Sequence, residues 1–291
     1  MRTGIFERVA TLFATRCQAA IGRVRSEVLI GEAVNLLRRH GVTSLNFGLK
    51  YGLSGQSQDD LYDSLTRSVA LEPDRIALFG YAHVPWMKTH QKMIDESALP
   101  DLTERFAQMN RAASTLTASG YTAIGIDHFA QSDDGLAIAR KNGKLRRNFQ
   151  GYTDDPADVL IGVGASAISR FPKGYSQNAA ATSAHVGAIR DGRFATARGH
   201  VFAGDDLLRG RIIEALMCDF TVRTGDLGRR FGLHPDTALQ MFERVNARFD
   251  GLLGVTPDGL TIPEDLRVLT RLVARAFDAY DMTGARHSSA I

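Results

Sequence analysis

The chain has 291 residues, of which 44% are hydrophobic and 23% are charged, and its formal net charge is +3. This composition is ordinary for a globular protein, and so small a charge gives no argument for nucleic acid or an anionic membrane surface as a partner. No apolar run approaches the ~20 residues that span a bilayer. The cysteines, Cys17 and Cys218, form neither a disulfide framework nor a CxxC metal pair. We therefore expect a cytoplasmic protein with no metal site of its own.

The N-terminal segment is basic. Residues 1–25 carry arginines with a single acid, Glu7, and their apolar residues recur at helical spacing. This pattern predicts a divergent basic helix over residues 1–27. It is also typical of a mitochondrial transit peptide, and the sequence leaves both readings open.

From Val28 onward, helical and strand patterns alternate. Helices are predicted over 28–41, 59–71, 101–119 and 133–143, and strands over 43–52, 75–84, 121–129 and 158–169. Ser57 is a good N-cap, and Gly41 and Gly120 are good helix stops. Alternation at this spacing favours a parallel sheet with helical crossovers. A closed barrel needs roughly eight strands, so we expect an incomplete (β/α) barrel over residues 28–200.

The predicted strands end on polar or aromatic residues, namely Lys50, Tyr51, Tyr81, His83, Asp127 and His128. In (β/α) barrels the active site is built at the carboxyl ends of the strands, so three such endings in succession favour a site there over the general exposure of strand ends. The stretch RNFQGYT (147–153) is too aromatic for a solvated loop and suits contact with a flat ligand. Gly162 and Gly164 indicate close approach, either of a ligand or of another part of the backbone.

From about Gly204 onward, the predicted secondary structure is mainly helical. Helices are predicted over 205–217, 224–233, 234–249 and 264–281, with a hairpin over 251–262. Helix, turn, helix and hairpin are the outline of a winged-helix module, so residues 201–291 are predicted to form a smaller winged-helix-like domain. The helix over 234–249 would offer DNA a poor basic face, which argues against DNA binding. Its two arginines, Arg244 and Arg248, are opposed by three acids in and next to the helix, Asp236, Glu243 and Asp250.

Several motifs occur together along the chain: QAAIGR (18–23), LNFGLKYGLSGQS (45–57), PDRIALFGYAHVP (73–85), GYTAIGIDHFA (120–130), RNFQGYT (147–153) and GVGASAIS (162–169). In this order and at this spacing they resemble the C-terminal part of the oxygen-independent coproporphyrinogen III oxidases, radical S-adenosylmethionine enzymes of haem biosynthesis. The resemblance runs from about Gln18 to the C-terminus.

The resemblance implies an oxidoreductase that converts propionates of coproporphyrinogen III to vinyl groups, giving protoporphyrinogen IX. It implies two molecules of S-adenosylmethionine and a 4Fe–4S cluster as cofactors. Arg23 and Ala82 match contacts of the second S-adenosylmethionine, and Ile168 matches an adenine contact of the first. Phe149 and Gln150 are expected at an edge of the cofactor chamber. No catalytic residue is assigned.

The sequence also departs from this family. It contains no CxxxCxxC motif, Gly48 stands where the family has a cofactor-binding aspartate, and Thr11 replaces a glutamine. We therefore expect an N-terminally truncated copy that is inactive alone, or active only with a chain that supplies the missing barrel half. Two alternatives stay open. One is a non-catalytic tetrapyrrole- or nucleotide-binding remnant, with His83 and His128 facing the ligand, and the other is a winged-helix DNA-binding module.

Overall fold

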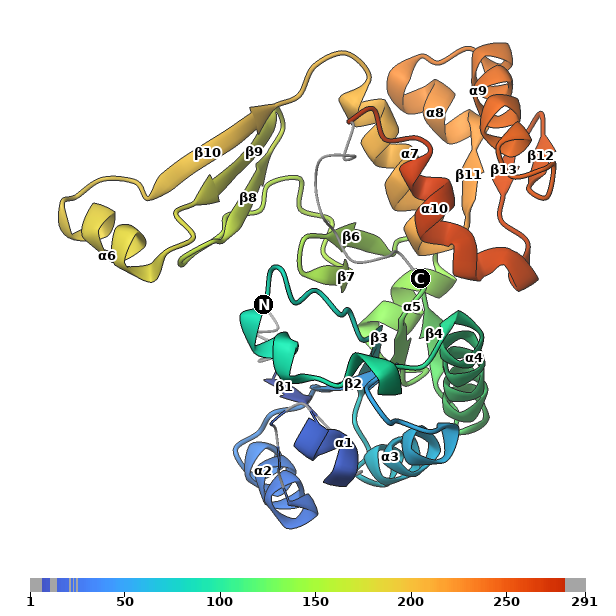
Figure 1. Cartoon of the computed structure of the whole chain (residues 1–291). Helices are drawn as coiled ribbons and strands as arrows, with labels where there is room; N and C mark the ends of the chain where they lie inside the picture. Colours follow the sequence, from blue (N-terminus) through green and yellow to red (C-terminus); the bar gives the residue numbers. More distant parts are fainter. Residues whose placement is uncertain (1–6, 11–14, 21, 23, 25, 281–291) are drawn as a thin grey trace. The chain divides into compact units, whose positions relative to one another are not determined.

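The computed structural model of the protein describes residues 7–10, 15–20, 22, 24 and 26–280 (Figure 1). These residues group into two units. The N-terminal unit contains the described residues up to Gly143 together with Asp265–Leu272. The C-terminal unit contains Lys144–Glu264 and Val273–Tyr280. None of the helices in the described part of the chain is both long enough and apolar enough to cross a membrane.

The N-terminal unit is built on a five-stranded sheet with the order β1-β2-β3-β5-β4. Its strands are β1 (Glu7–Ala10), β2 (Leu45–Tyr51), β3 (Arg75–Gly80), β4 (Thr122–Ile124) and β5 (His128–Ala130). β1, β2 and β3 run parallel to one another, whereas β5 is antiparallel to both β3 and β4. The α/β class and the parallel start of the sheet match the alternation in the sequence.

Two predicted elements of this unit are wrong. The helix predicted over residues 1–27 is interrupted by β1, because backbone pairing of Glu7–Ala10 with β2 outweighs a local helical pattern. The strand predicted over 121–129 is a pair of short antiparallel strands, β4 and β5. Gly125 takes a positive φ of 55° in the reversal between them, a conformation that glycine adopts without strain.

Four helices of this unit lie where the sequence predicts them: α2 (Glu27–Arg39), α3 (Gln58–Ala70), α4 (Leu102–Ala118) and α5 (Gly135–Lys141). The short α1 (Thr15–Ala20) is the described helical part of the N-terminal segment, and the 3-10 helices at Thr89–Met93 and Glu96–Ala98 were not predicted. Ser57 caps α3 in a reciprocal capping box with Asp60, and Asp101 caps α4. The core between sheet and helices is apolar and includes the fully buried Phe47 and Leu116.

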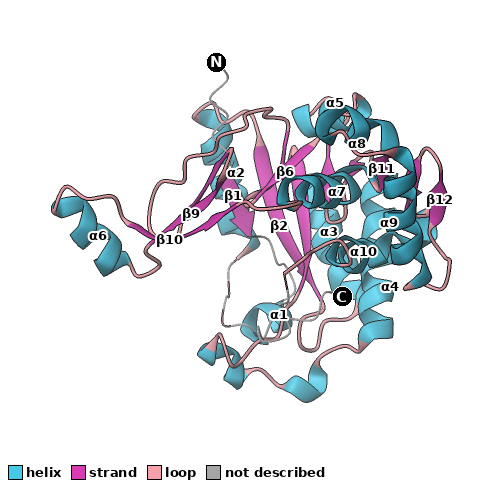
Figure 2. Ribbon diagram, turned by 90° about the horizontal axis from the view of Figure 1, so that it is seen from above, coloured by secondary structure: helices cyan, strands magenta, loops and turns pink. Residues whose placement is uncertain are grey.

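The C-terminal unit begins with a hairpin of β6 (Arg146–Asn148) and β7 (Gly151–Thr153). An antiparallel sheet of order β10-β9-β8 follows, made of β8 (Ile168–Phe171), β9 (Gly174–Asn178) and β10 (Thr196–Val201). Helix α6 (Thr182–Arg190) connects β9 to β10, and Figure 2 shows it at the end of this sheet that points away from α7.

The strand predicted over 158–169 is also wrong for most of its length. This segment makes only an isolated bridge, between Leu160 and Arg170, before β8 begins. Asn178 donates hydrogen bonds from Nδ2 to the carbonyl oxygens of Gly162 and Gly164, at 3.3 and 3.0 Å, so a side chain takes the place of a strand ladder. A Cβ on Gly162 would lie 2.7 Å from the carbonyl oxygen of Ile168. Close backbone packing therefore explains this glycine.

The rest of the C-terminal unit is mainly helical. It contains α7 (Asp206–Asp219), β11 (Thr221–Arg223), α8 (Thr224–Phe231), α9 (Pro235–Ala247), β12 (Gly254–Thr256) and β13 (Gly259–Thr261). β13 lies between β11 and β12 in a small antiparallel sheet, which confirms the predicted hairpin. The helix predicted over 264–281 is shorter. It is a 3-10 helix, Glu264–Leu269, followed by α10 (Thr270–Arg275), and Asp265–Leu272 of this segment belong to the N-terminal unit. Position 281 lies outside the described residues.

Candidate functional site at the strand ends

The carboxyl ends of β2 and β3 lie side by side. Lys50 pairs with Phe79, and the Tyr81 N–H donates to the Tyr51 carbonyl at 2.7 Å. The Leu78 N–H donates to the Asp127 carbonyl at 2.8 Å, which brings Asp127 to the same end. The prediction that Lys50, Tyr81 and Asp127 share one rim of the sheet is therefore confirmed.

Arg105 brings a guanidinium from α4 to this rim. Its Nη1 donates to the Tyr81 carbonyl at 2.9 Å, and its guanidinium carbon lies 6.0 Å from the centre of the Tyr51 ring. Its Nε is buried without a hydrogen-bond partner among the described residues. A Cβ on Gly80 would lie only 3.0 Å from the Tyr51 hydroxyl, so glycine leaves the room that these side chains use. A buried donor on a planar cation suits a carboxylate ligand.

Asp127 is the anionic group of the rim. Its Oδ1 lies 2.6 Å from His128 Nδ1, and its Oδ2 accepts a hydrogen bond from Arg271 at 2.7 Å. Burial raises the pKa of Tyr51, and Arg105 and Arg271 oppose that rise while Asp127 adds to it. Tyr51 is consequently a hydrogen-bond donor at neutral pH.

A second polar chain starts at Tyr81. The Tyr81 hydroxyl lies 3.2 Å from His83 Nδ1, and His83 Nε2 lies 2.9 Å from Glu96. Burial raises the pKa of Tyr81, so this phenol also stays protonated at neutral pH. Both ring nitrogens of His83 are thus engaged within the protein. The structure therefore lends no support to His83 as a ligand of a tetrapyrrole.

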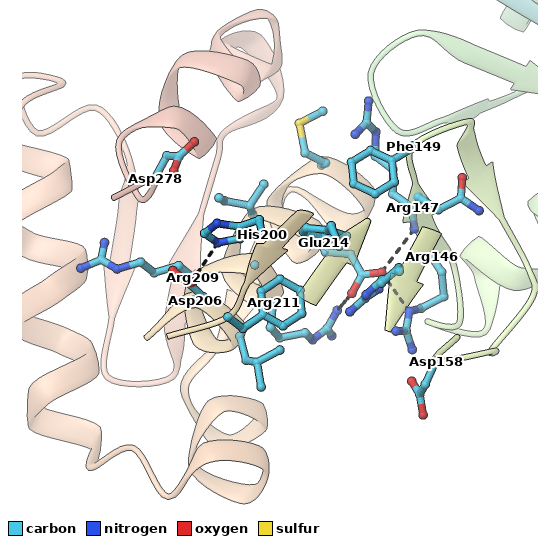
Figure 3. A pocket seen from close by; sticks show the side chains of 18 of the residues that line it. Arg146, Arg147, Phe149, Asp158, His200, Asp206, Arg209, Arg211, Glu214 and Asp278 are labelled. Carbon is cyan, nitrogen blue, oxygen red and sulfur yellow. Dashed lines mark hydrogen bonds and ion pairs between the residues drawn. The ribbon is translucent and has the colours of Figure 1, made fainter. Parts of the chain in front are cut away.

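The RNFQGYT stretch is a tight hairpin rather than an open loop. Phe149 and Gln150 form the turn between β6 and β7, and the Gln150 N–H donates to Asn148 Oδ1 at 2.8 Å. Phe149 is 52% exposed and meets the Tyr175 ring edge-to-face, with centres 4.9 Å apart. Phe149 lines a pocket of the C-terminal unit (Figure 3), whereas Gln150 is exposed and does not line it.

The remaining residues suggested by the resemblance belong to separate elements of the chain. Ala82 is exposed directly after β3, and its carbonyl accepts from Gln91 Nε2 at 3.0 Å. Gly48 lies within β2, between Ala10 and Ala77 of the neighbouring strands. Ile168 begins β8 in the other unit. Arg23 and Thr11 lie outside the described residues.

The thiols do not fit an iron–sulfur cluster. Cys17 and Cys218 are both fully buried, and burial raises the pKa of Cys218 to about 12. Within the described ranges, no three or more His, Cys, Asp or Glu side chains are grouped so as to hold a metal ion. Such clusters are held by several thiolates at close spacing. The described residues therefore do not form a site for such a cluster.

Burial of both thiols has a direct test. In the native protein, a thiol-specific chromogenic reagent is expected to react slowly with Cys17 and Cys218, because both side chains are inaccessible and burial also raises the pKa of Cys218. Both should react promptly in denaturant. Rapid labelling of the native chain, located by peptide mass spectrometry, would show that one of these thiols is available as a ligand after all.

Comparison with known proteins gives a consistent result, although no protein-family model matches the sequence. The chain is 49% identical over 279 residues to an oxygen-independent coproporphyrinogen III oxidase of Paracoccus denitrificans, covering 96% of this chain and 62% of that protein. It is 36% identical over 284 residues to one of Thermostichus vulcanus, covering 96% of this chain and 87% of that protein.

A solved structure agrees with these sequences. The coproporphyrinogen III oxidase of Escherichia coli, described as a radical SAM enzyme, matches with a TM-score of 0.87 and 32% identity, over 94% of this chain and 64% of that one. The chain thus spans less than two thirds of the Paracoccus and Escherichia proteins but most of the Thermostichus protein. Motifs, fold and similarity lead to one conclusion: the chain belongs to the family of oxygen-independent coproporphyrinogen III oxidases.

Proposed function

We propose that this chain takes part in the conversion of coproporphyrinogen III propionates to vinyl groups, the reaction after which its family is named. The observation that carries the proposal is family similarity over nearly the whole chain, in sequence and in fold. We interpret residues 28–200 as part of an incomplete radical-SAM-type barrel and residues 201–291 as a winged-helix-like domain. Contacts group residues 144–200 with the C-terminal helices, so this division by family likeness stays a prediction.

We assign S-adenosylmethionine to the residues suggested by the resemblance: Arg23, Ala82, Phe149, Gln150 and Ile168. When bound, it supplies the hydrogen-abstracting group of the family's chemistry. Gly48 contributes no carboxylate, so this contact has to come from elsewhere. Arg105 is a further binding residue, because its unpartnered Nε at the strand ends suits a carboxylate of cofactor or substrate. Tyr51 and Tyr81, both protonated at neutral pH, donate hydrogen bonds beside it.

These residues do not provide ligands for the 4Fe–4S cluster that the family uses. With Cys17 and Cys218 buried, we propose that the thiolates that hold it belong to polypeptide outside these 291 residues. The chain alone is then inactive. The alternatives are a non-catalytic tetrapyrrole- or nucleotide-binding role, or DNA binding through α8 and α9. The acids on α9 disfavour DNA, since Asp236 and Glu243 are exposed beside Arg244.

The test is anaerobic reconstitution of the purified chain with iron and sulfide. We expect no iron–sulfur absorbance and no 5′-deoxyadenosine from added S-adenosylmethionine, whereas the Paracoccus relative, treated in the same way, gives both. Addition of the part of that relative that this chain does not match is then expected to restore conversion of coproporphyrinogen III to protoporphyrinogen IX. A stoichiometric cluster on the chain alone would overturn the assignment of the thiolates. Failure of every combination to convert the substrate would favour a non-catalytic role.

A further inference from the structure

The positive charge of the chain is concentrated in one segment. Residues 159–204, which contain the β8–β10 sheet and α6, carry five basic side chains and one acidic one, a net charge of +4. The basic residues are Arg170, Lys173, Arg190, Arg193 and Arg198, and the acid is Asp191. Because the whole chain has a net charge of +3, the remaining residues are together slightly acidic. The small charge of the chain therefore hides a basic segment.

Much of this charge lies at one end of the sheet. α6 joins the end of β9 to the start of β10, and Figure 2 shows it at the end that points away from α7. Residues 182–198, which contain α6 and the start of β10, are called the α6 tip below. Its charged residues are Arg190, Arg193, Arg198 and Asp191. Asp191 lies 2.9 Å from Arg193, so the tip keeps an excess of positive charge.

The acids that flank this segment do not neutralise the tip. They are Asp154, Asp155 and Asp158 before it, and Asp205 and Asp206 after it. Asp158 and Asp206 line the pocket beside α7, and no residue of the tip lines that pocket. Asp206 also accepts hydrogen bonds from the Ala203 N–H and the Tyr280 hydroxyl, at 2.9 and 2.8 Å.

The α6 tip also exposes apolar side chains. Phe194 is 95% exposed and Ile189 is 54% exposed, whereas Ala188 and Ala195 beside them are buried. Val186 is exposed as well and lies three positions before Ile189, so both project from the same face of α6. Apolar side chains that are exposed as a group, rather than scattered singly, indicate an interaction surface.

The backbone fixes Phe194 on both sides. Gly192 takes a positive φ of 67° directly after α6, and its N–H donates to the Ile189 carbonyl at 3.0 Å. Glycine in this conformation is a common way to end a helix. One residue beyond Phe194, the Ala195 carbonyl accepts the Ala179 N–H at 2.8 Å. The exposed phenyl ring is therefore held ready for contact, which lowers the entropy lost on binding.

Arginines and apolar side chains at the end of a small sheet suit the surface of a bilayer. Anionic headgroups attract arginine, and apolar side chains enter the boundary between headgroups and acyl chains. A stable protein interface usually involves about 20–30 residues on each side, which is more than the tip contains. A fluid bilayer closes around so small a surface, whereas a folded partner would need a matching groove.

We propose that the α6 tip binds the surface of membranes that contain anionic lipids, with Ile189 and Phe194 at the acyl boundary and Arg190 and Arg193 on the lipid phosphates. The inference goes beyond the proposed function and requires neither a cluster nor S-adenosylmethionine. None of the tip residues is assigned to the cofactor. Its test therefore stands or falls separately from the reconstitution above.

The test is cosedimentation of the full chain with vesicles of phosphatidylcholine and phosphatidylglycerol in equal parts. We expect binding that weakens at least about tenfold on vesicles of phosphatidylcholine alone, and that also weakens in raised salt. Phe194→Ser should weaken binding at least about tenfold, because it removes a large apolar side chain. Arg190→Gln should weaken it about fivefold, as expected for one basic residue near an anionic surface.

Two exposed residues of the same unit, outside the tip, provide matched controls. Leu252→Ser removes an exposed apolar side chain, and Arg229→Gln removes an exposed arginine. Both variants should bind the mixed vesicles as the unchanged chain does. Circular dichroism checks that each variant is folded, and the exposure of Phe194 means that its replacement leaves the core intact.

Three results would overturn the proposal. The first is no binding to the mixed vesicles, or binding that Phe194→Ser and Arg190→Gln both retain. The second is binding to polyuridylate that is at least as tight and is weakened by the same substitutions, which would make the tip a nucleic-acid site. The third is loss of vesicle binding when the part of the Paracoccus relative that this chain does not match is added, since the tip would then be covered by polypeptide.

Discussion

Replacing Gln108 by leucine is expected to lower the free energy of unfolding of the N-terminal unit by about 3 kcal/mol. Gln108 lies on α4 and is fully buried. Its Oε1 accepts the Gly52 N–H and its Nε2 donates to the Gln56 carbonyl, both at 2.9 Å. Leucine would leave both backbone groups without a partner, and each buried orphan costs about 1–3 kcal/mol. Because these groups belong to the turn after β2, the rim around Tyr51 should loosen as well.

The measurement is urea denaturation followed by the fluorescence of Trp86, the single tryptophan of the chain, which lies in this unit. Asn35→Leu is the control, since it makes the same amide-to-leucine change at an exposed position of α2. It should shift the midpoint little. Equal midpoints for the two variants would show that the Gln108 hydrogen bonds do not hold this turn.

The second large effect is expected in the C-terminal unit. Glu214 accepts hydrogen bonds from Arg146 and Arg211, and also from the Arg147 N–H at 3.3 Å. Its side chain is only 12% exposed. Glu214→Ala removes the shared anion and leaves Arg146 without its partner. Breaking such a buried pair typically costs about 3–5 kcal/mol, and the partial exposure of Arg146 places the expected loss near the lower limit, about 3 kcal/mol.

Far-UV circular dichroism during denaturation measures this loss. Glu243→Ala, on the exposed surface of α9, is the matched control and should cost only a few tenths of a kcal/mol or less. Arg211 keeps its second partner, Asp226, at 2.9 Å, so the double variant Glu214→Ala with Asp226→Asn should be less stable than either single one. A Glu214→Ala protein as stable as Glu243→Ala would mean that Arg146 finds an equivalent partner.

Local signals account for what the sequence predicted well. Ser57 and Asp101 cap α3 and α4 with side chains that bond to nearby backbone, and Gly41 and Gly120 follow α2 and α4 in left-handed conformations. These interactions lie within one turn of the chain, so residue type alone reveals them. The polar endings of β2 and β3 were equally readable, because parallel neighbours bring them to one edge.

Long-range pairing accounts for the features that could not be predicted from the sequence. The reversal at Gly125 divides a continuous apolar pattern into β4 and β5, and only the antiparallel pairing with β3 distinguishes this from one strand. The contacts of the rim arginines, Arg105 and Arg271, were missed for the same reason. Arg105 looks like a solvated helix charge, and Arg271 meets Asp127 from far along the chain. No spacing rule in the sequence points to either contact.

The path of the chain between the two units has a consequence for biosynthesis. The polypeptide leaves the N-terminal unit after Gly143, returns to it over Asp265–Leu272, and then leaves it again. The returning segment carries Arg271, which closes the ion pair with Asp127. Domains generally fold as they emerge from the ribosome, the N-terminal one first. Here the N-terminal unit is completed only after residues 144–264 have been made, so on the ribosome Asp127 remains without Arg271 while most of the other unit is being synthesised.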